Sequence, residues 1–268
     1  FELNINTINM RRKNFQWSST LGFFFNRNQI RHLYYTYEDV LDGDGNIVGS
    51  KEIDDISNGW FIGRDISSIW TYNVQGIWQE SDKNAADRYG EIPGDVKVED
   101  VNNDGKYTNE DKKFMGYTKP RFRWSFRNDL TIFKNFELSL NIYSYMGHKQ
   151  TSTDYLNNLG ANTDRTNSYV RKYWTPENPS NTYARLNSTN VQNISPPRVI
   201  DKTFIRLDNI ALSYRVPDRL IRRLDMTQCK VFAGVRNVAV WSKEWEYWDP
   251  ETTSILPRVY TMGISASF

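Results

Sequence analysis

The residues best suited to chemistry form the run DVNNDGKYTNED at positions 100–111. Side-chain oxygens stand at its first, third and fifth positions, a glycine at the sixth and a carboxylate at the twelfth, a spacing that wraps one hard cation. The seventh residue would contribute its backbone carbonyl, and Gly105 would allow the sharp reversal of the chain. The run therefore predicts a structural Ca²⁺ site. Its candidate ligands are Asp100, Asn102, Asp104, Lys106 and Asp111.

Two features limit this prediction. Asp111 stands where an EF-hand has glutamate, and its shorter side chain predicts a modest affinity. Aspartate and asparagine also hold turns together through their own side-chain hydrogen bonds, so an Asx-rich turn without metal stays open as an alternative. If Ca²⁺ binds, we expect it to stiffen the long connection 26–120, which is too long for its own contacts to order.

We expect no catalytic residues and therefore no enzyme. His32 and His148 are the only histidines and fall in different predicted loops, and no Cys/His or His/His spacing suits zinc. No phosphate-binding loop or nucleophile elbow occurs. Acids between positions 82 and 111 could be paired into a glycosidase dyad, but with so many acids in one segment such a pairing indicates little.

The composition excludes several other classes of protein. A net charge of +2 over 268 residues is too small to indicate a nucleic-acid partner. The mean hydropathy is −0.69, and no run of 18 apolar residues predicts a membrane-spanning helix. A membrane sheet remains compatible, because alternation dilutes hydrophobicity, and 15% of the residues are aromatic. Cys229 is a single cysteine and cannot form an internal disulfide.

The elements that would carry these residues are strands. In 258–268 one face is large and apolar up to the terminal Phe268, while Thr261, Gly263, Ser265 and Ser267 form the other face. This period of two is typical of a strand with lipid on one side and water on the other. Six further segments show the pattern: 1–6, 15–25, 121–133, 136–146, 203–215 and 230–240. In 203–215 the alternation changes phase, which predicts a bulge near Asp208 and Asn209.

The connections between these seven segments alternate between short and long. The short ones are 11–14, 134–135 and 216–227, and the long ones are 26–120, 147–202 and 241–257. Outer-membrane barrels place short turns in the periplasm and long loops outside. Such barrels have an even strand number, and this chain opens directly in strand pattern without an initiator Met or signal peptide, so we expect it to be the C-terminal part of something larger.

A soluble fold alternates in the same way. The alternative is a secreted, calcium-stabilised β-sandwich that binds carbohydrate. Strands of 10–13 residues and the terminal aromatic favour the membrane barrel, since a tilted transmembrane strand needs about 9–11 residues.

Several motifs together resemble one family. These are DVKVEDVNNDGKYTNED at 95–111, WTPENP at 174–179, FIRLDNIALSYRVP at 204–217, FAGVRNV at 232–238 with DPE at 249–251, and the final MGISASF. In this order they resemble the C-terminal third of SusC/RagA-type TonB-dependent transporters. The resemblance implies an all-β membrane barrel of about 22 strands. This chain, 1–268, would supply the last seven antiparallel strands and three extracellular loops, without the plug domain and the N-terminal strands.

The resemblance also implies a function and partners. The function would be TonB-dependent import of a nutrient, a glycan or an oligopeptide, through the outer membrane. The implied partners are a SusD-like surface lipoprotein, TonB acting through the missing N-terminal region, the remainder of the barrel and outer-membrane lipid. No substrate-binding residue can be assigned from the sequence. Lumen-facing Arg121, Arg123 and Arg127 could select an anionic cargo, although interior charges paired across strands are the commoner case.

Overall fold

The computed structural model describes residues 1–153, 172–186, 188, 194–252 and 254–268. The chain divides into two compact units, which we describe separately. The sheet unit comprises Phe1–Arg27, Lys119–His148 and Asp201–Phe268, and the loop unit comprises Asn28–Thr118 and Lys149–Ile200. Among the described residues, no helix has the length and apolar character needed to cross a membrane.

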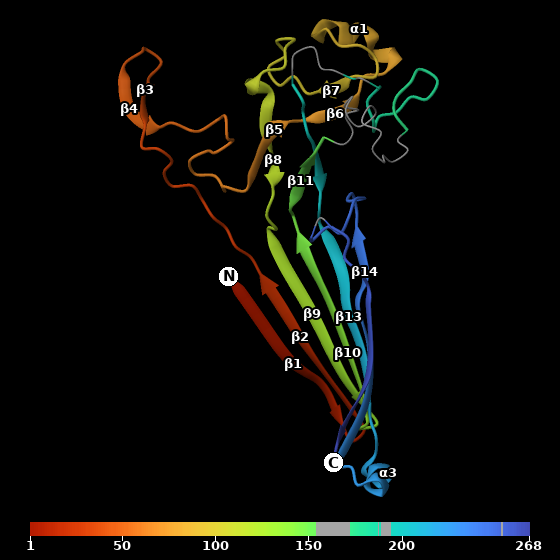
Figure 1. Cartoon of the computed structure of the whole chain (residues 1–268). Helices are drawn as coiled ribbons and strands as arrows, with labels where there is room; N and C mark the ends of the chain where they lie inside the picture. Colours follow the sequence, from red (N-terminus) through yellow and green to blue (C-terminus); the bar gives the residue numbers. More distant parts are fainter. Residues whose placement is uncertain (154–171, 187, 189–193, 253) are drawn as a thin grey trace. The chain divides into compact units, whose positions relative to one another are not determined.

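The sheet unit contains one antiparallel sheet in the order β1-β2-β9-β10-β13-β14-β15 (Figure 1). Its strands are β1 (Glu2–Arg12), β2 (Phe15–Phe24), β9 (Phe122–Ile132), β10 (Phe136–Met146), β13 (Phe204–Arg215), β14 (Gln228–Ser242) and β15 (Val259–Ser267). All seven strands predicted from period two are confirmed, and each pairs with the predicted strand before and after it. The first strand is longer than expected, because it continues to the turn at Lys13 and Asn14.

Two irregularities interrupt the strand pairing of the sheet. The pairing of β13 with β14 skips from Leu207 to Asn209, which confirms the predicted bulge at Asp208. A second register shift in β1, between Ile8 and Met10, leaves Asn9 unpaired. The pattern did not predict it, because only the first six residues alternate clearly.

The apolar face of this sheet is uncovered. Phe122, Trp124 and Phe126 are only partly buried by their neighbours, and the described residues of the sheet unit form no second sheet over them. The β-sandwich alternative is therefore wrong, because its apolar face would lie in a dry interior. Large apolar side chains of this unit are exposed from one edge of the sheet to the other: Leu3, Ile5, Leu21, Leu212, Met262 and Ile264.

One polar cluster interrupts the apolar face between β1, β2 and β9. The carboxamide oxygen of Asn128 accepts hydrogen bonds from Ser19 Oγ (2.7 Å) and Trp17 Nε1 (2.9 Å), and Asn9 Nδ2 donates to Ser19 Oγ (2.6 Å). Ser19 is only 7% exposed. The period-two pattern could not account for Asn128 on the apolar face, because the hydrogen-bond partners of its side chain lie on a neighbouring strand. In this cluster the donors of Asn9, Trp17 and Ser19 each find an acceptor on a surface that is otherwise apolar.

We expect Asn128→Ala to destabilise the sheet by about 1–3 kcal/mol, because two donors on the apolar face then lose their acceptor. Asn6→Ala is the matched control, since Asn6 accepts a hydrogen bond from Thr20 Oγ1 (2.7 Å) on the opposite, polar face. A folded barrel and its unfolded chain migrate differently on a gel. The measurement is the temperature at which the full-length protein changes from the folded to the unfolded mobility. Equal midpoints for the two variants would contradict the prediction.

The loop unit has secondary structure and a core of its own. Its strands pair as β3 (Tyr37–Leu41) with β4 (Ile47–Glu52), β5 (Ser68–Tyr72) with β8 (Lys112–Tyr117), β6 (Val74–Ile77) with β7 (Val96–Val98), and β11 (Lys149–Ser152) with β12 (Arg198–Asp201). Short helical turns η1 (Glu80–Asp82), α1 (Lys83–Ala86), η2 (Asp87–Tyr89) and η3 (Asn109–Asp111) connect them. The core contains Tyr72, Ile77, Val96, Val98, Tyr107, Trp174 and Ala184. This core joins residues of the connection 26–120 to Trp174 and Ala184 of the connection 147–202, which agrees with the expectation that 26–120 is not ordered by its own contacts alone.

Candidate functional site

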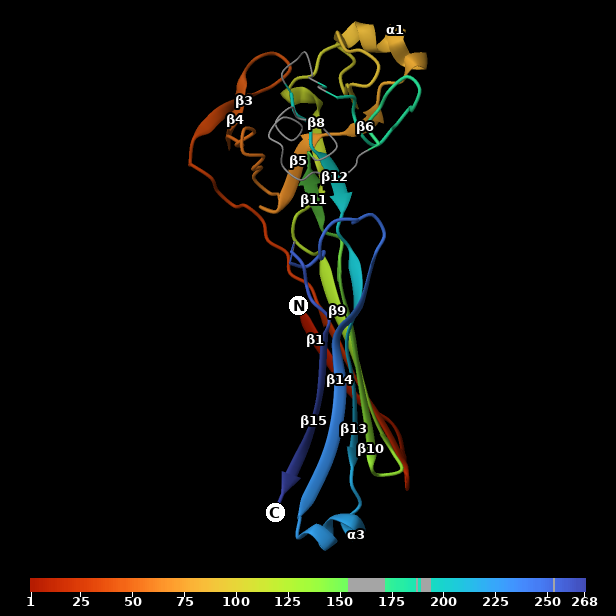
Figure 2. The ribbon, with the colours of Figure 1, turned by 45° about the vertical axis from the view of Figure 1, so that its right-hand side comes forward.

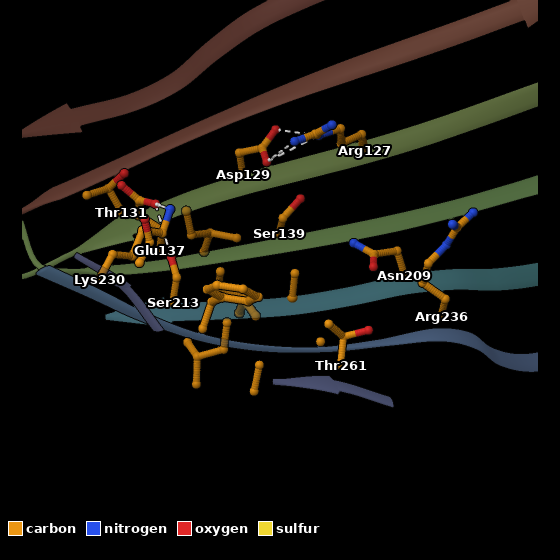
Figure 3. Close-up of a pocket in the computed structure, with 18 residues that line it drawn as sticks. Arg127, Asp129, Thr131, Glu137, Ser139, Asn209, Ser213, Lys230, Arg236 and Thr261 are labelled. Atoms are coloured by element: carbon orange, nitrogen blue, oxygen red, sulfur yellow. Dashed lines mark hydrogen bonds and ion pairs between the residues drawn. The ribbon is translucent and has the colours of Figure 1, made fainter. Parts of the chain in front are cut away.

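The polar face of the sheet is hollowed. A cavity of about 680 Å³ is lined by residues of β9, β10, β13, β14 and β15 (Figure 3). Five neighbouring strands of one sheet can share a cavity only on the side toward which the sheet curls. The lining of this concave face includes the polar side chains Arg127, Asp129, Thr131, Glu137, Ser139, Asn209, Ser213, Lys230, Arg236, Thr261 and Ser265.

Most charges in this cavity are paired. Arg127 Nε lies 2.9 Å from Asp129 Oδ2, and Lys230 Nζ lies 2.8 Å from Glu137 Oε2 (Figure 3). Arg215 Nη2 lies 3.5 Å from the other oxygen of Glu137. Arg127 is therefore paired, but with Asp129 of its own strand β9 and not across strands as expected. Both carboxylates of the cavity, Asp129 and Glu137, are therefore neutralised by neighbouring cations.

A second cavity of about 310 Å³ lies on the same face, near the ends of the strands that lead into the long connections. Its lining includes Phe24, Arg123, Tyr143, Tyr145 and Glu251. The Arg123 guanidinium lies 4.4 Å from the Tyr145 ring centroid and 5.9 Å from that of Phe24. Arg123 forms no ion pair with a described residue. The two aromatic rings therefore position a guanidinium group that no carboxylate of the described residues neutralises. Selection of an anionic cargo stays a prediction.

A buried ion pair anchors the segment between β14 and β15. Arg206 of β13 is 1% exposed, and its Nη2 lies 2.8 and 2.6 Å from the two carboxylate oxygens of Asp249. Glu251 Oε2 lies 3.6 Å from Arg206 Nε and accepts a hydrogen bond from Tyr143 O–H at 2.5 Å. Asn237 Oδ1 accepts a further hydrogen bond from Arg206. The motifs FIRLDN and DPE, both noticed in the sequence, are therefore spatial partners, which sequence reasoning did not predict.

The predicted metal loop lies in the loop unit and has the expected turns. Asp100 Oδ2 accepts from Gly105 N–H (2.9 Å), Asn102 Oδ1 from Asp104 N–H (3.1 Å) and Asp104 Oδ1 from Lys106 N–H (2.8 Å). Gly105 adopts φ +80°, the left-handed conformation that the reversal requires. This hydrogen-bonded geometry is that of the Asx-rich turn.

Asp111 closes the loop without pointing a free carboxylate into it. It is completely buried and accepts from Val101 N–H (2.9 Å) and Thr108 N–H (2.7 Å). Asp100 Oδ1, in contrast, is buried and has no hydrogen-bond partner among the described residues. No group of three or more His, Cys, Asp and Glu side chains within the described ranges converges in a way that could hold a metal ion. The unpartnered Asp100 Oδ1 could coordinate a cation, whereas both oxygens of Asp111 already accept backbone hydrogen bonds. Calcium binding stays a prediction.

The ionisation of Asp100 is consistent with either interpretation of the loop. Desolvation raises its pKa, but the N–H groups of Gly105, Asn103 and Asp104 and the Tyr89 hydroxyl stabilise the carboxylate more strongly. The pKa of Asp100 is therefore below its ordinary value, and the side chain is negative at neutral pH.

The two histidines have separate structural roles. His32 belongs to the loop unit, where its Nδ1 lies 2.9 Å from Glu52 Oε2 and its ring stacks on Tyr35. His148 belongs to the sheet unit and packs against Phe204. Burial, helped by the positive charge of Lys202, lowers the pKa of His148 to about 4, so it is neutral at physiological pH.

Comparisons with known proteins agree with this geometry. No family model matches the chain. It is 24% identical to "TonB-dependent receptor P3" of Formosa agariphila over 257 residues, which is 94% of this chain and 25% of the relative. It is also 24% identical to "TonB-dependent receptor P26" of the same organism, over 100% of this chain and 29% of the relative. The chain thus spans between a quarter and a third of the curated relatives it matches.

Solved structures show the same fold. The structure of the RagAB peptide transporter aligns with a TM-score of 0.70 and 18% identity, covering 100% of this chain and 29% of that one. The "closed-closed" state of the RagAB peptide importer aligns with a TM-score of 0.71, also with 18% identity and over 29% of its length. The fold is all-β and matches part of these transporters. The resemblance to part of a SusC/RagA-type TonB-dependent transporter is therefore confirmed.

Proposed function

We propose that this chain forms barrel wall and outer loops of a TonB-dependent importer in the bacterial outer membrane. The observation that carries the proposal is the division of a single curled sheet into an exposed apolar face and a hollowed polar face. Such a sheet separates hydrocarbon from a hydrated passage. The relatives are named TonB-dependent receptors, and the titles of the matching structures describe a peptide transporter and importer.

The cargo would be a nutrient too large for a porin, either a glycan or an oligopeptide. The wall itself supplies a sealed path and one side of the binding cavity, and performs no bond chemistry. In a complete barrel of about 22 strands, plug and N-terminal strands would come from residues outside this chain. TonB would act through that region, and a SusD-like surface lipoprotein would cover the extracellular loops. Both partners rest on the family resemblance.

The location and orientation can be tested with single cysteines in the full-length protein, after Cys229→Ser. Asp44→Cys lies in the turn between β3 and β4, and Asp218→Cys lies in the connection between β13 and β14, where both aspartates are exposed. A membrane-impermeant maleimide should label position 44 in intact cells and position 218 only after the outer membrane is permeabilised. Labelling of both positions in intact cells, or of neither, would overturn the proposed orientation.

We also propose that the 100–111 loop binds Ca²⁺ as a structural ion, on the strength of the open Asp100 Oδ1. Calorimetry on the full-length protein should then detect binding with a Kd of roughly 10⁻⁴ to 10⁻³ M. Asp100→Asn should abolish the heat. Asp42→Asn is the matched control, because the exposed turn at 42–46 has the similar sequence DGDGN and its own Asx hydrogen bonds to Asp42. Absence of binding at millimolar Ca²⁺ would leave the Asx-rich turn as the complete account.

A further inference from the structure

Charge is segregated at one end of the sheet unit. The three short connections, 13–14, 133–135 and 216–227, together with Arg11 and Arg12 at the end of β1, contain seven cationic and two acidic side chains, a net charge of +5, whereas the whole chain carries +2. All other residues together therefore carry −3. We call these three connections, with Arg11 and Arg12, the turn end. Its seven cations are Arg11, Arg12, Lys13, Lys134, Arg219, Arg222 and Arg223.

Backbone hydrogen bonds hold the three connections of the turn end next to one another. Phe133 N–H donates to the Asn14 carbonyl (2.7 Å), which joins the first two connections, and Arg215 N–H donates to the Asn135 carbonyl (2.8 Å), which joins the second to the start of the third. Figure 2 shows the helix α3 (Asp218–Ile221) of the third connection at this end of the strands. All seven cations are exposed, and none forms an ion pair with a described residue. Their charge is unneutralised, unlike that of Arg127 and Lys230 inside the cavity.

Apolar side chains stand among the cations. Phe133 is 69% exposed and has φ +50°, and Leu220, beside Arg219, is 55% exposed. The left-handed region is costly for a bulky aromatic, and glycine or asparagine would occupy this turn with less strain. An exposed phenylalanine in a strained backbone conformation indicates that the Phe133 side chain has a function at the surface of the protein. Girdles of aromatic residues flank the apolar band of transmembrane barrels at both membrane interfaces.

The position of the turn end identifies the occupant. The apolar face ends at Phe15, Ile132 and Phe136, which immediately flank the first two connections. The cations therefore begin where the hydrocarbon-facing band stops, at headgroup depth. Lysine and arginine near a membrane surface attract anionic lipids. We infer that the turn end binds the phosphate groups of anionic phospholipids in the leaflet on its side of the membrane. This inference rests on the proposed membrane location.

The experiment reconstitutes the full-length transporter into nanodiscs of phosphatidylcholine alone or of phosphatidylcholine and phosphatidylglycerol in roughly equal amounts. After partial delipidation, mass spectrometry counts the two lipids that stay bound. We expect the wild type to retain phosphatidylglycerol in preference at low salt, and to lose the preference near 1 M salt, where the Debye length is about 3 Å.

Two turn-end variants, Arg11→Gln/Arg12→Gln/Lys13→Gln and Arg219→Gln/Arg222→Gln/Arg223→Gln, should each reduce that preference by at least about threefold. The control, Arg31→Gln/Lys83→Gln/Arg88→Gln, removes three exposed cations from the loop unit and should keep it. No preference in the wild type, or equal loss in the control, would overturn the inference while leaving the transporter proposal intact. Failure of the wild type to insert even into phosphatidylcholine discs would instead refute the membrane location, and this inference with it.

Discussion

Arg206→Leu is expected to destabilise the full-length protein by about 3–5 kcal/mol, because it leaves the carboxylate of Asp249 buried without its cation. The side chains of the pair are only 1% and 5% exposed. The substitution should also release the segment between β14 and β15, because the hydrogen bonds from Arg206 to Asp249 hold this segment on the sheet. The measurements are the thermal midpoint of the folded barrel and the rate at which a protease cuts between residues 243 and 258.

Two further variants test whether the loss of stability comes from leaving one charge of a buried pair without its partner. Arg127→Leu removes an arginine from an ion pair on the same face, but that pair is 57% and 41% exposed, so its loss should cost less than about 1 kcal/mol. Arg206→Leu/Asp249→Leu should recover most of the lost stability, since removing both charges of a buried pair is often close to neutral. If Arg206→Leu and Arg127→Leu unfold at the same temperature, the buried pair does not anchor the segment.

Met262→Arg should reduce the stability of the inserted barrel by about 2–4 kcal/mol, the cost of a cation on the lipid face near the middle of the bilayer. Met262 lies in the middle of β15, opposite Ala233 of β14, and is 86% exposed. Thr261→Arg is the control in the same strand, because Thr261 lines the polar cavity. Denaturant titration of the full-length protein in lipid vesicles measures both. A near-neutral Met262→Arg would mean that this face is in contact with water.

The strands could be predicted because period two is a local signal. Each residue of β9, β10 or β15 faces lipid or lumen according to its own parity, so no distant partner is needed to recognise the strand. The same signal failed at Asn128, whose polar side chain is tolerated on the apolar face only by Ser19, 109 residues away in the sequence. The bulge at Asp208 was recognisable because it changes the parity, whereas the bulge at Asn9 falls where alternation is already weak.

The contents of the long connections were largely beyond sequence reasoning. The hairpin of β3 and β4 had a usable signal, Asp-Gly between two short apolar runs, which was overlooked. The core that contains both Trp174 and Tyr72 had no such signal, because it joins segments about a hundred residues apart. The spacing of the 100–111 loop predicted its turns and the conformation of Gly105, but not that Asp111 would be committed to backbone N–H groups.

The central claim is that alternate side chains of one strand face hydrocarbon and a hydrated lumen. It is tested most directly by an environment-sensitive fluorophore on Phe126→Cys or on its neighbour Ser125→Cys in β9, in the full-length protein carrying Cys229→Ser and reconstituted into lipid vesicles. Brominated lipid should quench the probe at position 126 and aqueous iodide the probe at position 125. Equal quenching of both probes by both agents, or quenching of position 126 by iodide alone, would contradict the account.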